Sequence, residues 1–152
     1  MAFKAKRPVL IRIQPQFVKD IKSGEKKEEY RSREFVDCNC LILHQSQEGQ
    51  GIVAVVEVGP SKIEINEEGK ERHEYPILRV FDFKETIPIE TAFDNTPITR
   101  KISSRYQDFT YLRDNGEWTP ESEAAAAEAV KILLSTHKHT TKTFPKQPKQ
   151  DG

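Results

Sequence analysis

The residues with the clearest chemical potential lie in one short segment, 24–31, which holds two lysines, three glutamates, a tyrosine and an arginine after its glycine. If the chain extends into a strand here, its side chains alternate, and Glu29 shares a face with Lys27 and Arg31. Lys26 lies in the turn, so its direction is not fixed. Such a face can form an ion-pair network. It can also form a polar cleft in which arginine binds phosphate and the carboxylate accepts a hydrogen bond from a base edge or a sugar hydroxyl.

A short helix is predicted to present this segment. A proline at the start and Gly24 just past the end bracket Pro15–Ser23, which predicts a helix with a left-handed glycine cap. The strand-like run Val9–Ile13, rich in β-branched residues, precedes it. The apolar face of the helix would comprise Phe17, Val18 and Ile21.

Further strands are expected downstream. Cys40–His44 and Ile52–Val58 are separated by a glycine-containing link that favours a hairpin. The near-continuous apolarity of the second run indicates burial on both faces, as inside a small barrel. Acidic residues around Gly69 predict an exposed turn or ribbon over 61–75, and Ile77–Phe83 alternates like a half-buried strand.

The last third of the chain contains one clear helix signal. Thr119 and Pro120 are suited to the N-cap and first residue of a helix that runs to about Ser135, with acidic residues near its positive end. A short strand is expected before it, at Phe109–Leu112. The packing face of the helix would comprise Ala126, Val130 and Leu133 or Leu134.

These elements predict one domain over residues 8–136, with a flexible basic arm at 1–7 and a disordered basic tail at 137–152. Five or six short strands with two flanking helices are typical of an α+β fold built on a small curled sheet.

Composition limits the class of protein. The 152 residues suit one domain, and 24 basic against 24 acidic residues do not indicate a polyanion partner. The charges are nonetheless segregated: residues 1–34 hold ten basic and five acidic side chains, 105–136 hold three and six, and 137–152 hold four and one.

Two cysteines exclude a disulfide scaffold. No apolar run approaches the roughly 18 residues that a membrane helix needs. Since the N-terminus also lacks a signal-like stretch, we expect a cytoplasmic protein.

The early part of the chain resembles the ASCH domain, a family of the PUA-like superfamily. The resemblance covers roughly residues 8–90 and places the motif between a helix end and a strand. It rests on Leu10–Pro15, Phe17, Ile21–Lys26 and Glu29–Arg31, within which the family signature Gly-x-Lys-x-x-Glu-x-Arg is matched by Gly24, Lys26, Glu29 and Arg31.

The resemblance implies a small PUA-like β-barrel with helices beside a cleft, and binding of RNA or another nucleic acid. Neither a metal nor a cofactor is expected. The expected nucleic-acid site, which would hold a nucleotide or a single-stranded segment, comprises Lys26, Lys27, Glu29, Tyr30 and Arg31. Arg31 would form the floor of the cleft and the two lysines its lip. A base could stack on Tyr30, Tyr106 or Trp118.

The resemblance also implies a second possibility. Some small bacterial ASCH proteins are amidohydrolases that remove the acetyl group from N4-acetylcytidine, using a lysine at the position of Lys26, a threonine at that of Glu29 and a distant glutamate. Catalysis by Lys26 and Glu29 on a modified nucleoside is therefore a second hypothesis, with Glu29 replacing the threonine. Glu57 or an acidic residue within 64–74 would supply the distant carboxylate.

Simpler interpretations stay open. Lys26, Glu29 and Arg31 could be no more than surface ion pairs. Cys38 and Cys40 share a strand face, but without a second pair of ligands we expect packing rather than metal binding. A third function, from another class, is a protein-interaction module that uses the acidic late helix. The oligomeric state cannot be predicted from these features.

Overall fold

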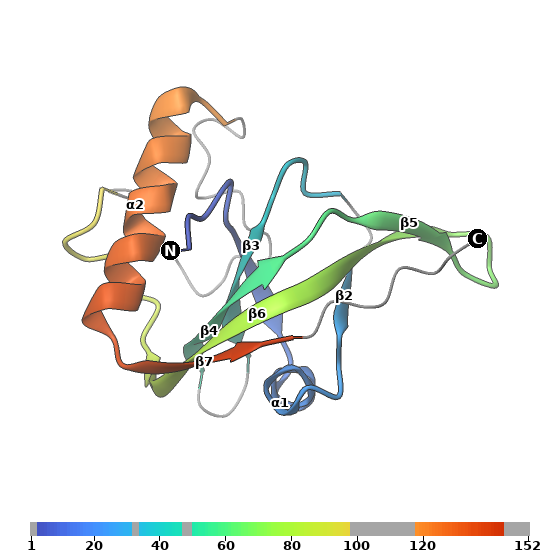
Figure 1. Ribbon diagram of the computed structural model, residues 1–152, viewed down its shortest axis with the longest axis horizontal. Coiled ribbons are helices and arrows are strands. Elements are labelled where there is room, and N and C mark those ends of the chain that lie inside the picture. The colour runs from blue at the N-terminus through green and yellow to red at the C-terminus, as the bar shows by residue number, and fades with distance from the viewer. Residues whose placement is uncertain (1–2, 32–33, 47–49, 98–117, 145–152) are drawn as a thin grey trace.

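The computed structural model describes residues 3–31, 34–46, 50–97 and 118–144 (Figure 1). The described chain forms seven strands and two helices. In chain order these are β1 (Val9–Ile13), α1 (Pro15–Ser23), β2 (Glu28–Arg31), β3 (Cys40–Gln45), β4 (Gly51–Val58), β5 (Lys62–Ile65), β6 (Glu71–Ile87), α2 (Pro120–Thr136) and β7 (His139–Thr143). This agrees with the predicted α+β class.

The long strand β6, of 17 residues, organises the sheet. The strand order is β1-β3-β4-β6-β2, and β5 and β7 also pair with β6. The first part of β6 pairs with β2 and β5, and the rest pairs with β4 and β7. The pair β1–β3 is parallel and the other pairs are antiparallel, so the sheet is mixed. Figure 1 shows β6 running from the β5 hairpin on the right, through the middle of the molecule, to the lower left near the start of β7.

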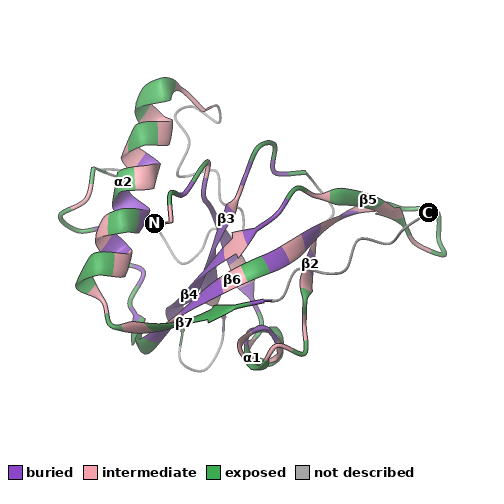
Figure 2. Cartoon of the chain, in the orientation of Figure 1, coloured by how far each residue is buried: buried purple, intermediate pink, exposed green. Residues whose placement is uncertain are grey.

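The expected closed barrel is not what the described pairings form. Their path starts at β1 and ends at β2, which leaves an open sheet of seven strands rather than a closed one of five or six. The burial of β4 on both faces does not require a closed barrel, because other elements packed on the sheet can bury the strand as well. That cover includes side chains of both helices. The same core as the strands contains Val18 and Ile21 of α1 and Ala129, Val130 and Leu133 of α2. Figure 2 shows buried stretches on both helices.

Helix α1 begins and ends where the sequence predicts. Pro15 occupies its first turn, and Gly24 follows with φ of 88°, a left-handed conformation that suits glycine. Val18 and Ile21 are buried. Phe17 differs from the expectation, since 45% of it is exposed. Its ring lies beside Lys26 and is not part of the core.

Helix α2 also begins as expected. Thr119 is the N-cap, and its hydroxyl and the hydroxyl of Ser122 each accept a hydrogen bond from the other residue's backbone N–H. The helix ends at Thr136, close to the predicted Ser135. Neither described helix is long and apolar enough to span a membrane. The predicted strand at 109–112 lies outside the described residues.

Both of the terminal segments that the sequence separates from the domain contact it in the described structure. The predicted tail contains β7, whose residues pair with Arg79–Phe83 of β6, and Phe144 beyond it is buried. The sequence of β7 consists of threonine, lysine and histidine and therefore looks like a loop. This edge strand needs no apolar face, because it is mostly exposed (Figure 2). In the predicted arm, Ala5 is buried and Arg7 forms an ion pair with Glu123 of α2 at 2.6 Å.

The predicted exposed ribbon over 61–75 corresponds to the β5–β6 hairpin. It turns at Asn66–Gly69, where Gly69 adopts φ of 79°. Ile63 and Ile65 of β5 are largely exposed. The separate strand expected at 77–83 is instead the central part of β6. Its continuation to Ile87 was missed because the charged residues that follow Phe83 resemble a loop.

Candidate functional site

The site is built where α1 ends and β2 begins. After Gly24 the chain turns back, and the backbone N–H of Lys26 donates to the carbonyl of Asp20 at 3.0 Å. Among the described strands, β2 pairs with β6 alone and lies at the edge of the sheet. The register places Glu29 opposite Tyr75 and Arg31 opposite His73, so these four residues share one face of the sheet.

Glu29 is the most unusual residue of this segment. Only 7% of it is exposed. Its Oε1 atom accepts a hydrogen bond from the backbone N–H of Tyr30 at 3.1 Å, a group that an edge strand leaves without a strand partner. The Nζ atom of Lys26 and the Nε atom of Arg31 each lie 3.9 Å from the same oxygen. The other oxygen, Oε2, is buried and has no hydrogen-bond partner. Leaving such an oxygen unpaired costs about 1–3 kcal/mol.

Arg31 completes this arrangement. Its guanidinium donates from Nη2 to the carbonyl of Arg12 at 3.4 Å, whereas its Nε atom is buried and has no hydrogen-bond partner. Two cations, Lys26 and Arg31, therefore surround the single carboxylate of Glu29 and leave one positive charge in excess. A ligand with a hydrogen-bond donor close to an anionic group would match this site, because the donor could bind Oε2 of Glu29 and the anion could bind the excess positive charge.

Lys26 lies between two aromatic rings. Its Nζ atom is 4.9 Å from the ring centre of Phe17 and 5.6 Å from that of Tyr30. Beside it lies an open depression of about 370 Å³, which we call the motif hollow. The motif hollow is lined by Phe17, Asp20, Glu25, Lys26, Lys27, Glu28 and Tyr30.

The motif hollow differs from the expected cleft in two respects. Its lining carries two lysines against three carboxylates, so it is not a simple polyanion pocket. Arg31 does not line it and so does not form its floor; it lies with Glu29 on the other face of β2. The cause is the alternation of the strand, which sends Tyr30 and Glu28 to one side and Glu29 and Arg31 to the other. Lys26, in the turn, contacts both groups.

Tyr30 is held in place by its neighbours. The guanidinium of Arg72 lies 4.1 Å from its ring centre, and its hydroxyl donates to Glu28 at 3.3 Å. Partial burial and then the nearby carboxylates of Glu74, Glu28 and Glu64 raise its pKa, which keeps the phenol protonated at neutral pH. A base stacking on Tyr30 would have to approach from the ring face that is not covered by Arg72.

His73 of β6 is a site residue that the sequence did not reveal. It lies opposite Arg31, is 9% exposed, and its Nδ1 atom is buried without a hydrogen-bond partner. Its position in an acidic, ribbon-like stretch indicated solvent exposure. Only the pairing of β6 with β2 identifies it, although the alternation of His73, Tyr75 and Ile77 on β6 was a weak signal of a buried face.

Two of the residues considered for a distant carboxylate, Glu57 and Glu64, are already paired. Glu57 contacts Arg79 through two nitrogens, at 2.8 and 2.9 Å. Glu64 pairs with Arg72 at 3.0 Å. Neither is thus placed as a free carboxylate beside Lys26.

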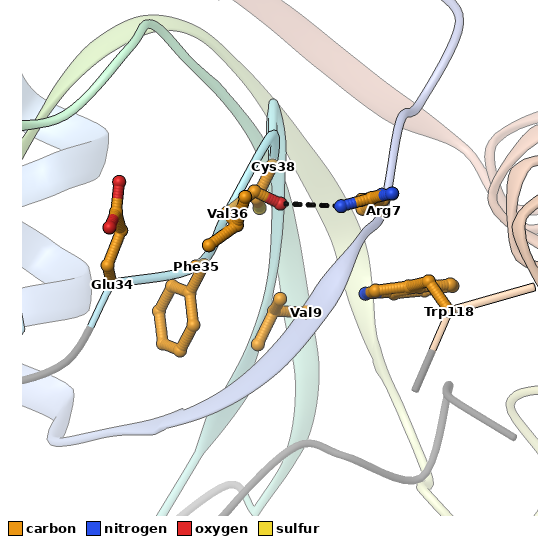
Figure 3. A pocket seen from close by; sticks show the side chains of 7 residues that line it. All are labelled: Arg7, Val9, Glu34, Phe35, Val36, Cys38 and Trp118. Atoms are coloured by element: carbon orange, nitrogen blue, oxygen red, sulfur yellow. Dashed lines mark hydrogen bonds between the residues drawn. The ribbon is translucent and has the colours of Figure 1, made fainter. Parts of the chain in front are cut away.

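The remaining candidates lie elsewhere or outside the described chain. Trp118 lines a separate cavity of about 120 Å³, where its ring lies beside Arg7 and Val9 (Figure 3). Tyr106 falls outside the described residues. Cys38 and Cys40 are both buried thiols, and the thiol of Cys38 donates to the carbonyl of Cys40 at 3.2 Å. Burial, and then the nearby Cys38 and Glu57, raise the pKa of Cys40, which favours a packing role. In the described part of the chain, no three histidine, cysteine or acidic side chains are grouped as metal ligands.

No protein-family model matches this sequence, and no curated protein matches it. Solved structures do. The chain is similar to an ASCH protein of Zymomonas mobilis, with 13% identity and a TM-score of 0.57 over 87% of this chain and 96% of that one. A serine-to-alanine variant of the Zymomonas protein gives a TM-score of 0.61 at 13% identity, over 90% of this chain and 100% of that one. A tyrosine-to-phenylalanine variant gives 0.55 at 11% identity, over 88% and 100%. The chain therefore has the ASCH-domain fold, as the signature around Gly24 and Arg31 predicted.

Proposed function

We propose that this protein binds single-stranded nucleic acid, with RNA as the preferred ligand. The site would comprise Lys26, Lys27, Glu29, Tyr30 and Arg31. The observation that carries the proposal is the carboxylate of Glu29, which is buried between two cations with Oε2 lacking a hydrogen-bond donor. A native fold rarely retains such a group without a use for it.

A nucleotide offers what this arrangement lacks. An exocyclic amine of a base or a ribose hydroxyl can donate to Oε2 of Glu29, while the excess positive charge of Lys26 and Arg31 attracts phosphate. The exposed ring of Phe17 and the partly exposed ring of Tyr30 provide apolar surface on which a base can stack, worth about 1–3 kcal/mol per base. Because the motif hollow is mixed in charge, base contacts contribute more to this binding than phosphate contacts.

The fold supports the same proposal at a coarser level. The chain is similar to ASCH structures over most of its length, and the resemblance noted in the sequence relates that family to PUA-like, RNA-binding domains. Lys142 on β7 adds positive charge near the site, because its Nζ atom donates to the carbonyl of Ser23 at 2.9 Å.

Binding of a labelled single-stranded RNA tests the proposal. With a fluorescent oligonucleotide of about ten nucleotides, enough to cover one small domain, fluorescence anisotropy should detect binding at low salt that weakens as salt is added. Replacing Glu29→Gln should weaken binding about tenfold, because the carboxylate loses its charge and its strong acceptor. Arg31→Met should have a similar effect.

Matched variants on exposed positions are the controls. Lys19→Met on α1 removes a cation from the solvent side of the helix, and Glu85→Gln removes an acid near the end of β6. Both should bind RNA like the unmodified protein. Binding no stronger than that of a neutral control protein, or equal losses in Lys19→Met and Arg31→Met, would reject the proposal.

Hydrolysis of a modified nucleoside is a second candidate, favoured by the placement of the Lys26 ammonium 3.9 Å from a buried carboxylate and beside two aromatic rings. In such a reaction Glu29 would take a proton from the water that attacks the acetyl carbonyl carbon, and Lys26 would stabilise the developing oxyanion. The C–N bond would then break as Glu29 passes the proton to the departing amine, which releases acetate and the nucleoside. Release of acetate from N4-acetylcytidine, abolished by Lys26→Met and by Glu29→Gln, would support it. Absence of turnover in the unmodified protein would reject it and leave binding alone.

A further inference from the structure

The β2–β6 pairing adds a residue to the motif face. In the register, Arg31 lies directly opposite His73, and Glu29 lies opposite Tyr75. Residues that face each other across an antiparallel pair project to the same side of the sheet and lie close enough to share a ligand. His73 is therefore the cross-strand neighbour of Arg31, although 42 positions separate them in the printed sequence.

Three buried polar atoms on this face lack hydrogen-bond partners. They are Oε2 of Glu29, Nε of Arg31 and Nδ1 of His73, which we call the inner polar cluster. Glu29 and His73 are both more than nine-tenths buried. One unpaired atom could reflect local packing, but three on neighbouring residues of one face indicate a common missing partner.

The opposite face of the same strands is different. There the Tyr30 ring packs against Arg72 and its hydroxyl donates to Glu28, while Arg72 pairs with Glu64. The Nε atom of Arg72 is also buried without a hydrogen-bond partner, but its guanidinium is held by Glu64 and by the Tyr30 ring, so among the described residues this face has one such atom against three on the other. Arg31 is the most exposed residue of the inner polar cluster, with 25% of its side chain exposed, so a ligand would approach from that side.

We propose that His73 is a third ligand-binding residue and hydrogen-bonds the same nucleotide as Glu29 and Arg31. This inference rests on the proposed function. The cluster presents one acceptor, Oε2 of Glu29, next to two nitrogens. Nε of Arg31 is always a donor, and Nδ1 of the His73 ring can donate or accept. It thus fits a group in which a donor and an acceptor are adjacent. A ribose hydroxyl and the amine edge of a base both have this chemistry.

Affinities of a His73→Phe variant for RNA and for DNA of the same sequence test the inference. The phenyl ring keeps the size of the side chain but removes the nitrogen, so binding should weaken about tenfold, as expected for one lost hydrogen bond in a buried site. A loss for RNA alone would identify the ribose hydroxyl as the ligand group, and a loss for both nucleic acids would identify the base edge. His73→Gln, which keeps a donor and an acceptor, should retain most of the affinity.

His139→Phe is the matched control, because His139 also lies beside β6 but packs against Phe81 and Phe83. It should bind both nucleic acids like the unmodified protein. NMR of the His73 ring nitrogens in the unmodified protein gives a second readout that does not depend on a folded variant, since they should shift when the RNA is added. If the His73→Phe variant binds RNA normally while the Glu29→Gln variant does not, the proposal that His73 contacts the nucleotide is wrong and the proposed function stands. If the unmodified protein does not bind RNA, both fail.

Discussion

Single residues decide the chemistry of this protein, and Glu29 is the clearest case. The sequence placed it between Lys26 and Arg31 and, through strand alternation, on the face of Arg31. What the sequence could not predict is its near-complete burial and its unpaired Oε2 atom. Burial of a charged side chain depends on what packs over it, which is a property of the whole sheet and not of the neighbouring residues.

His44 gives a testable pH dependence at this scale. It is 2% exposed, and burial, followed by the charge of Arg12, lowers its pKa from 6.5. The unfolded chain therefore binds a proton below about pH 6.5 that the folded chain resists, so folding stability should fall as pH drops through this range. Urea denaturation of the unmodified protein and of His44→Leu should show a steeper loss between about pH 7 and pH 5 in the unmodified protein. Equal losses in the two proteins would contradict this origin.

At the scale of elements, local signals were most reliable where the backbone itself is constrained. The proline and glycine around α1 and the capping residues of α2 predicted both helix starts, because these signals act within one turn. The strands were found less completely. Strand β7 and the outer part of β6 are polar and are stabilised by pairing across the sheet, which no local pattern reports.

The N-cap of α2 provides a prediction for a single element. Thr119→Ala removes the hydroxyl that accepts from the backbone N–H of Ser122 and should lower the free energy of unfolding by about 1 kcal/mol. Thr119→Ser keeps the hydroxyl and should restore most of this loss. The exposed Ser135→Ala near the other end of the helix should change stability by less than about 0.5 kcal/mol. Thermal or urea denaturation measures all three, and an unchanged Thr119→Ala protein would show that the cap does not limit stability.

At the scale of the whole molecule, β6 connects the core to the candidate site. Its inner part pairs with β4 within the core. Its outer part pairs with β2 and places His73 opposite Arg31 and Tyr75 opposite Glu29. The site residues thus depend on one long strand that joins the two regions. Tyr75 reinforces this connection, because its ring stacks on Phe35 and its hydroxyl accepts from the backbone N–H of that residue at 2.5 Å.

Docking of the C-terminal strand can be tested at this scale. Phe144 follows β7, is buried in the common core, and its backbone N–H donates to the carbonyl of Leu78 at 2.8 Å. Phe144→Ala should lower the free energy of unfolding by about 3 kcal/mol, as for other buried phenylalanines. The exposed Thr141→Ala on β7 should change it by less than about 0.5 kcal/mol. If both variants unfold like the unmodified protein in urea, β7 does not contribute to the folded state in solution.

The sequence by itself determined the features that short-range physics controls. These are the α+β class, the bounds of α1, the start of α2 and the order of charges from Gly24 to Arg31. The tertiary structure decided which of those charges are buried, that the sheet stays open, and that His73 stands opposite Arg31. The physical reason is range: caps, turns and alternation act within a few residues, whereas burial and strand register depend on contacts between segments far apart in the chain.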